Sequence, residues 1–192
     1  MIARVHTVIA NAMPVAALAS ALRDEFSRVI RLAPGYTGGL LLVDDGAATV
    51  IVVSLWENST TAIPELPIPA TATVRDDASG IYTVAFSSRT LGGVMARITS
   101  VRLTPDQESI DRGIRLHMNS AMMNATAQGG FRSGLLLVDR PGHRAITIGL
   151  WDSLAAIEVG EASGYSQSQL ALYAEFIASP PLRLIAGVLL DE

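Results

Sequence analysis

Few side chains in this sequence can move protons or hold a ligand, and four of them fall in its second half. His117 lies in one predicted helix and Tyr173 in another, while Thr147 lies on a predicted strand that ends at Trp151. Thr147 and Trp151 are four residues apart, so they share one face of that strand. A neutral imidazole can act as a general base near pH 7, and a threonine hydroxyl can bind the same ligand. We therefore name His117 and Thr147 as candidate catalytic residues.

The candidate ligand-binding side chains are aromatic or flexible and apolar. They are Trp151, Tyr173, Met118, Met122 and Trp56. Methionine side chains can line an adaptable apolar pocket, but they also fill irregular gaps in a core. Each Trp could equally fill the space between a sheet and its helices, and His117 could be a boundary residue bonded to a backbone carbonyl.

Several other chemistries lack the residues they need. The chain has no Cys, and all fourteen of its Lys-plus-Arg cations are Arg. Schiff-base lysines, P-loop lysines, cysteine nucleophiles and thiolate zinc sites are therefore excluded. The three histidines (His6, His117 and His143) are too far apart in sequence for a zinc pattern, and no Gly-x-Ser-x-Gly elbow is present. We expect no metal site.

Composition predicts a folded chain with a sizeable core. Its 192 residues are 49% hydrophobic and 17% charged, with a net charge of −4. No basic face suits nucleic acid, and no apolar run reaches the roughly 18 residues of a membrane span. The apolar run Val5–Ala21 is interrupted by His6, Asn11 and Pro14, so we expect no cleaved signal and a cytoplasmic protein.

An internal repeat organises the sequence. Gly35–Trp56 and Gly130–Trp151 align at an offset of 95, with ten of 22 positions identical. Two copies at so long a period indicate one small domain that has been duplicated and fused. We expect a first domain over residues 1–95 and a second over residues 96–192.

Each copy predicts the order β-α-β-β-α-β, the ferredoxin-like arrangement of an α+β protein. In the first copy the strands are Ala3–Ala10, Gly38–Asp44, Ala48–Trp56 and Ile81–Ser87, with one helix from Val15 to Ile30. In the second copy the strands are Ala96–Leu103, Gly134–Asp139, His143–Trp151 and Leu182–Leu190, with helices over Pro105–Ala127 and Ser166–Ala178. The second helix of the first copy is replaced by Thr60–Asp77, where three prolines predict an extended, degenerate segment.

The motifs that end the third strands, Trp56-Glu57-Asn58 and Trp151-Asp152-Ser153, resemble those of the dimeric α+β barrel superfamily. The resemblance is closest to the antibiotic-biosynthesis-monooxygenase-like family, and it covers both halves of the chain. Members of this family pair two such sheets. The resemblance therefore implies a tandem-repeat pseudo-dimer, either monomeric or a homodimer.

The resemblance also implies a chemistry. Family members that oxidise aromatic polyketides use neither metal nor flavin, because the substrate anion itself reduces oxygen. Their pocket includes the strand Trp, an Asn four residues before it and a Tyr six residues after it. Here the Asn positions hold Val52 and Thr147, and the Tyr positions hold Ala62 and Ile157. Haem-degrading relatives need a second-helix His, which Ser163–Pro180 lacks.

Two functions remain open on the sequence. The first is a cofactor-independent monooxygenase that acts on a hydroxylated aromatic or polyketide-like compound. The second is a non-enzymatic ligand-binding or assembly barrel that has lost its catalytic residues. In either case we expect a small apolar or aromatic ligand in residues 96–192, near Trp151 and His117, because only that copy keeps both predicted helices.

Overall fold

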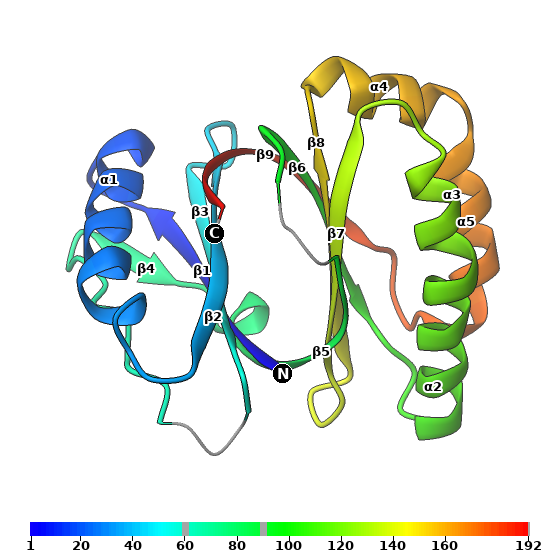
Figure 1. Cartoon of the computed structure of the whole chain (residues 1–192), viewed down its shortest axis with the longest axis horizontal. Coiled ribbons are helices and arrows are strands. Elements are labelled where there is room, and N and C mark those ends of the chain that lie inside the picture. Colours follow the sequence, from blue (N-terminus) through cyan, green and yellow to red (C-terminus); the bar gives the residue numbers. More distant parts are fainter. Residues whose placement is uncertain (59–61, 89–91, 192) are drawn as a thin grey trace. The chain divides into compact units, whose positions relative to one another are not determined.

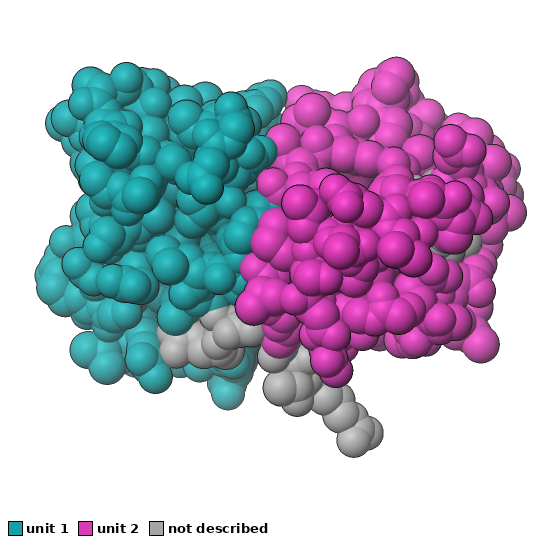
Figure 2. All heavy atoms as spheres, turned by 90° about the horizontal axis from the view of Figure 1, so that it is seen from above, with its two compact units in different colours: residues 1–83, 186–192 teal, residues 84–185 magenta. Residues whose placement is uncertain are grey.

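The computed structural model describes residues 1–58, 62–88 and 92–191, which form two compact units. Unit 1 contains Met1–Thr83 and Ala186–Glu192, and unit 2 contains Val84–Ile185 (Figure 2). Strands β5 (Gly80–Ser87) and β9 (Leu182–Asp191) each begin in one unit and end in the other. Within the described ranges, no helix is long and apolar enough to cross a membrane.

Unit 1 is an antiparallel sheet covered by one long helical segment (Figure 1). Strand β3 lies between β2 and β1, the start of β5 extends the edge of β1, and the end of β9 pairs with β2. The elements are β1 (Ile2–Ala10), α1 (Val15–Glu25), η1 (Phe26–Ile30), β2 (Tyr36–Asp44), β3 (Thr49–Trp56), β4 (Ala72–Val74) and η2 (Asp76–Ala78). The apolar side chains of α1 and η1 pack on β2 and β3 because they recur at helical spacing.

Unit 2 repeats this plan with more helix (Figure 1). Strand β8 lies between β7 and β6, and β9 is the neighbour of β6 on its other edge. The elements are β6 (Met95–Arg102), α2 (Gln107–Leu116), η3 (His117–Ala121), α3 (Met122–Thr126), β7 (Phe131–Asp139), β8 (Arg144–Trp151), α4 (Leu154–Ala162), α5 (Tyr165–Tyr173) and η4 (Ala174–Phe176). The strand orders β5-β1-β3-β2 and β9-β6-β8-β7 are those of a ferredoxin-like fold, as predicted.

The two repeated hairpins, β2–β3 in unit 1 and β7–β8 in unit 2, are equivalent residue by residue. Tyr36 pairs with Trp56 and Phe131 with Trp151, and each hairpin has a register shift directly after that pair. Both tryptophans are fully buried and meet the paired aromatic ring edge to face. Their indole nitrogens differ, because Trp56 Nε1 donates to Ser54 Oγ at 2.9 Å whereas Gly149 stands at the corresponding place in unit 2.

The helices of unit 2 differ from the predicted ranges. Helix α2 begins at Gln107, two residues later than expected, because the Asp106 carboxylate accepts the Ser109 N–H at 2.8 Å and caps it. Helix α4 was not predicted from the sequence. Ser153 Oγ accepts the Ala156 N–H and caps the start of this helix. Gly164 then adopts the left-handed conformation, with φ of 76°, and separates α4 from α5.

Candidate functional site

A cavity of about 140 Å³ lies inside unit 2, between its sheet and its helices. Strands β6, β7 and β8 with the start of β9 form one wall, and the segment from α2 to η3 together with α5 and η4 forms the other. All of the lining residues lie between Arg97 and Arg183, so unit 2 alone contains the site.

The sheet wall changes from charged to apolar along β6. Residues 97, 99, 101 and 103 line the cavity because alternate side chains of a strand share one face. Thr99 pairs with Thr147 and Val101 pairs with Ala145, so a row of two hydroxyls lies beside an apolar row. At the apolar end, Val101 packs on a cluster formed by Ile110, Leu136, Val138 and Ala145.

The helical wall places His117 about two turns along the helix from Ile110, which belongs to the apolar cluster. Ile110, His117 and Ala121 recur at helical spacing and line the cavity. Seven residues of helix separate Ile110 from His117, a rise of about 10 Å. Gly113 lets η4 approach, because a Cβ there would lie 3.3 Å from the Phe176 ring.

His117 is the buried ionisable group of the cavity. Its side chain is 9% exposed, and Nδ1 lies 3.2 Å from the Tyr173 hydroxyl. Nε2 is buried and has no hydrogen-bond partner among the described residues. Burial lowers the pKa of His117 to about 4, so the ring is neutral at pH 7. If Nδ1–H donates to Tyr173, Nε2 carries an unused lone pair and can accept a proton.

Acidification is expected to destabilise the fold through His117. Its pKa is about 4 in the folded chain and 6.5 ordinarily, so between these values the unfolded chain binds more protons. The contribution of His117 to the free energy of unfolding therefore has its full value above pH 6.5, and it falls by about 3 kcal/mol as the pH drops toward 4. Denaturant unfolding of wild-type and His117→Leu proteins at both pH values measures this. Burial also lowers the pKa of His6, but that effect is common to both proteins. Parallel pH curves would contradict the expectation.

Two arginines at the cavity share one carboxylate. Arg97 Nη1 donates to Glu161 Oε1 at 2.9 Å, and Arg183 Nη1 donates to Glu161 Oε2 at 3.1 Å. The guanidinium of Arg97 also lies 5.7 Å from the centre of the Trp151 ring. Both arginines line the cavity and Glu161 does not, and no acidic side chain of the described chain lines it.

The structure brings three of the predicted site residues together. His117, Thr147 and Tyr173 all line the cavity, whereas Trp56, Trp151, Met118 and Met122 are not among its lining residues. Both Trp rings are buried in the packing between sheet and helices. Met118 is 43% exposed, and Met122 packs over Gly134.

Sequence reasoning missed the charged part of the site. Arg97 could have been found, since it shares a strand face with Thr99 two residues later. Nothing in the sequence pointed to Arg183, because it lies on the last strand, far along the chain from the other residues of the site. Among the described residues, no group of three or more His, Asp or Glu side chains could hold a metal ion.

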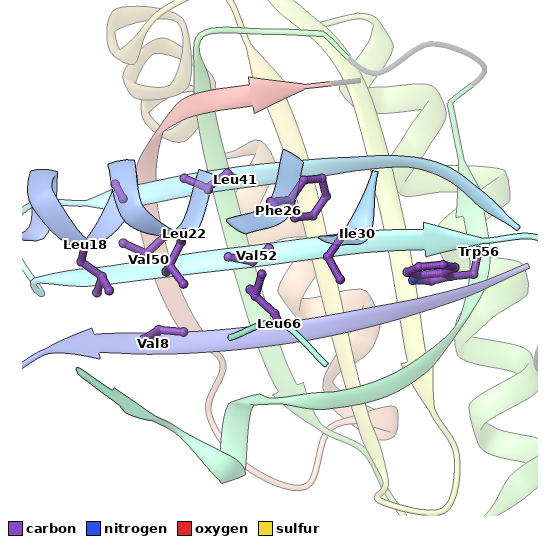
Figure 3. Packing of buried hydrophobic residues seen from close by; sticks show 11 residues of the cluster. Val8, Leu18, Leu22, Phe26, Ile30, Leu41, Val50, Val52, Trp56 and Leu66 are labelled. Atoms are coloured by element: carbon purple, nitrogen blue, oxygen red, sulfur yellow. The ribbon is translucent and has the colours of Figure 1, made fainter. Parts of the chain in front are cut away.

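In unit 1 the corresponding space is filled. The predicted extended segment carries no helix over residues 62–71; its first two residues, Thr60 and Thr61, lie outside the described ranges. Leu66 of this segment is 4% exposed and lies beside Val52, the counterpart of Thr147 (Figure 3). Arg4, the counterpart of Arg97, pairs with Glu65 at 2.6 Å.

Known proteins share this fold across the whole chain. A proposed monooxygenase of Fusobacterium nucleatum matches 100% of this chain and 93% of its own, at 13% identity and a TM-score of 0.69. A haem-degrading enzyme of Listeria monocytogenes matches 97% and 99%, at 14% identity and a TM-score of 0.61. A ferredoxin-fold protein of the same species, related to antibiotic biosynthesis monooxygenases, matches 97% and 94% at 14% identity, also with a TM-score of 0.61.

Sequence comparison adds two uncharacterised proteins of Mycobacterium tuberculosis, from strains CDC 1551 and H37Rv. Each is 29% identical over 151 residues, which is 71% of this chain. The match spans 65% of the length of those relatives. No protein-family model matches the chain. The structural likenesses show that the chain has the ferredoxin-like α+β fold of the Fusobacterium and Listeria proteins.

Proposed function

We propose that unit 2 binds a hydroxylated aromatic compound with a single ring and catalyses its cofactor-independent monooxygenation. The observation that carries the proposal is the unpartnered Nε2 of His117, buried at the wall of a largely apolar cavity. A buried polar atom without a partner costs free energy, and a ligand hydroxyl would supply the missing partner.

The size of the cavity supports one ring rather than several. Its volume is about 140 Å³. An engineered apolar cavity of about 150 Å³ binds benzene. A substituted phenol would fill this volume, whereas a polyketide-like compound with several fused rings would extend out of it. One protein of the same fold, an anthrone oxidase-like protein, is in keeping with oxidation of an aromatic ring.

The proposed reaction begins with proton transfer. His117 Nε2 accepts the phenolic proton, and the phenolate that forms beside it stabilises the imidazolium and so offsets the lowering of its pKa by burial. Tyr173 holds Nδ1 so that Nε2 faces the ligand. Neighbouring guanidinium groups stabilise the phenolate, and Thr147 contributes a hydroxyl at the same wall. The phenolate then reduces molecular oxygen. One oxygen atom enters the ring as a quinone carbonyl, and the other leaves as water with the phenolic proton and the hydrogen of the oxidised ring carbon.

Oxygen uptake with meta-cresol tests the proposal. The wild-type protein is expected to consume oxygen and yield a product that has gained one oxygen and lost two hydrogens. His117→Asn is expected to lower the rate by roughly 100-fold or more, as loss of a general base does. The matched control is His6→Asn in unit 1, because His6 is also buried with an unpartnered Nε2 but lies in the other repeat.

The contrary outcomes are distinct. Tight binding of meta-cresol without oxygen uptake would overturn the oxygenase proposal and establish the alternative of a ligand-binding protein. Equal rates for wild-type and His117→Asn proteins would remove His117 as the base. If calorimetry detected no binding of any single-ring phenol, the proposed occupant of the cavity would be wrong.

A further inference from the structure

We infer that the ligand of unit 2 carries a carboxylate, which Arg97 and Arg183 hold while its hydroxyl faces His117. The inference rests on the proposed function and narrows the substrate to a hydroxylated aromatic acid. It starts from the charges at the cavity, where two guanidinium groups share the single carboxylate of Glu161.

The group formed by Arg97, Arg183 and Glu161 contains two guanidinium groups and one carboxylate. Arg97 and Arg183 each donate a hydrogen bond from Nη1 to Glu161. Among the described residues, the Arg183 side chain makes no hydrogen bond other than this one. The Nε and Nη2 donors of Arg183 therefore remain for a second carboxylate. Arginine presents its donors as a planar fork that matches the two oxygens of a carboxylate.

The position of the arginines on the wall fits an amphiphilic ligand. Arg97 and Leu103 both point into the cavity, from the start of β6 and from the residue that follows its end. At the usual rise per residue of a strand, their Cα atoms lie about 20 Å apart. The threonine row lies next to Arg97, and the apolar cluster lies beyond it. A ring substituted with an acid would place its carboxylate toward Arg97 and its apolar edge toward Val101.

Comparison with unit 1 shows that this arrangement belongs to the repeat with the cavity. There Arg4 pairs with Glu65, one cation with one anion. Strand β5, the counterpart of β9, contains no charged residue, so nothing corresponds to Arg183. The extra cation therefore occurs beside the open space and is missing beside the filled one.

The test compares three ligands that differ in one substituent. They are meta-hydroxybenzoate, its uncharged amide meta-hydroxybenzamide, and meta-cresol. Isothermal titration of the wild-type protein is expected to show roughly 10- to 100-fold tighter binding of the acid than of the amide, as charged hydrogen bonds provide. Arg183→Gln is expected to remove this preference, because it weakens binding of the acid far more than binding of the amide.

Two further variants exclude a merely structural effect. Glu161→Gln removes the competing carboxylate and is expected to tighten binding of the acid. Arg4→Gln is the matched control, because it breaks the equivalent ion pair in unit 1 and is expected to change no affinity. Thermal unfolding of each variant checks that the fold is retained.

The outcomes separate this inference from the proposed function. Equal affinity for acid and amide, with oxygen uptake on meta-cresol, would overturn the carboxylate inference and leave the oxygenase proposal standing. Binding of the acid that depends on Arg183, without oxygen uptake, would overturn the oxygenase proposal and support the carboxylate inference. An acid preference that Arg183→Gln leaves intact would also overturn the inference.

Discussion

Replacing Trp151 by alanine is expected to lower the free energy of unfolding by about 3–5 kcal/mol, as truncation of a buried Trp does. The ring is fully buried, and its neighbours come from several elements. Phe131 meets it edge to face at 5.2 Å, and a Cβ at Gly160 would lie 3.5 Å from it. The helices cannot close fully on the space left by an indole, so a void remains. Denaturant unfolding monitored by circular dichroism measures the loss.

Trp151→Phe separates the volume of the ring from its N–H group. Trp151 Nε1 is buried without a partner among the described residues, so phenylalanine removes a costly polar atom as well as some volume. We expect this variant to lose clearly less stability than the alanine variant. A loss below 1 kcal/mol for Trp151→Ala would mean that the ring does not support the core.

Replacing Leu66 by alanine is expected to cost about 2–5 kcal/mol and to open in unit 1 the space that unit 2 already has. Leu66 is buried against Val8 and Val52, and it belongs to the proline-rich segment that replaces a helix. That segment is held by its prolines and by the Arg4–Glu65 pair, so it collapses only in part. Chemical unfolding gives the cost.

Leu32→Ala is the matched control, because Leu32 is 78% exposed and its truncation should change stability by at most about 0.5 kcal/mol. Benzene is a second probe of the new space. It is expected to raise the melting temperature of Leu66→Ala more than that of the wild-type protein. A loss as small as that of Leu32→Ala would mean that the segment does not plug unit 1.

The repeated hairpins could be predicted in detail. Their strands are nearly continuous apolar runs, their turns contain Asp45-Gly46 or Pro141-Gly142, and each ends at a Trp. The predicted ends of β3 and β8 at Trp56 and Trp151 agree with the structure. These features are local, because strand pairing in a hairpin follows from the turn and from the side-chain alternation on either side of it.

The candidate site could be predicted only in part. His117, Thr147 and Tyr173 were chosen because each lies on a face expected to point between sheet and helices, and all three line the cavity. Trp151 was chosen on the same argument, yet it is not a lining residue. Alternation tells which face of a strand a residue occupies, but not whether a neighbour from another element covers it.

By itself, the sequence predicted the repeated hairpins, the ferredoxin-like order of elements and a segment without helix over the described residues 62–71, because periodicity and proline act on neighbouring residues. Only the tertiary structure decided that Leu66 fills one repeat while the other keeps a cavity. It also decided that Arg97, Glu161 and Arg183 meet, and that His117 is buried with Nε2 unpaired. These properties depend on packing between segments far apart in the chain, which sets burial and the pKa of His117.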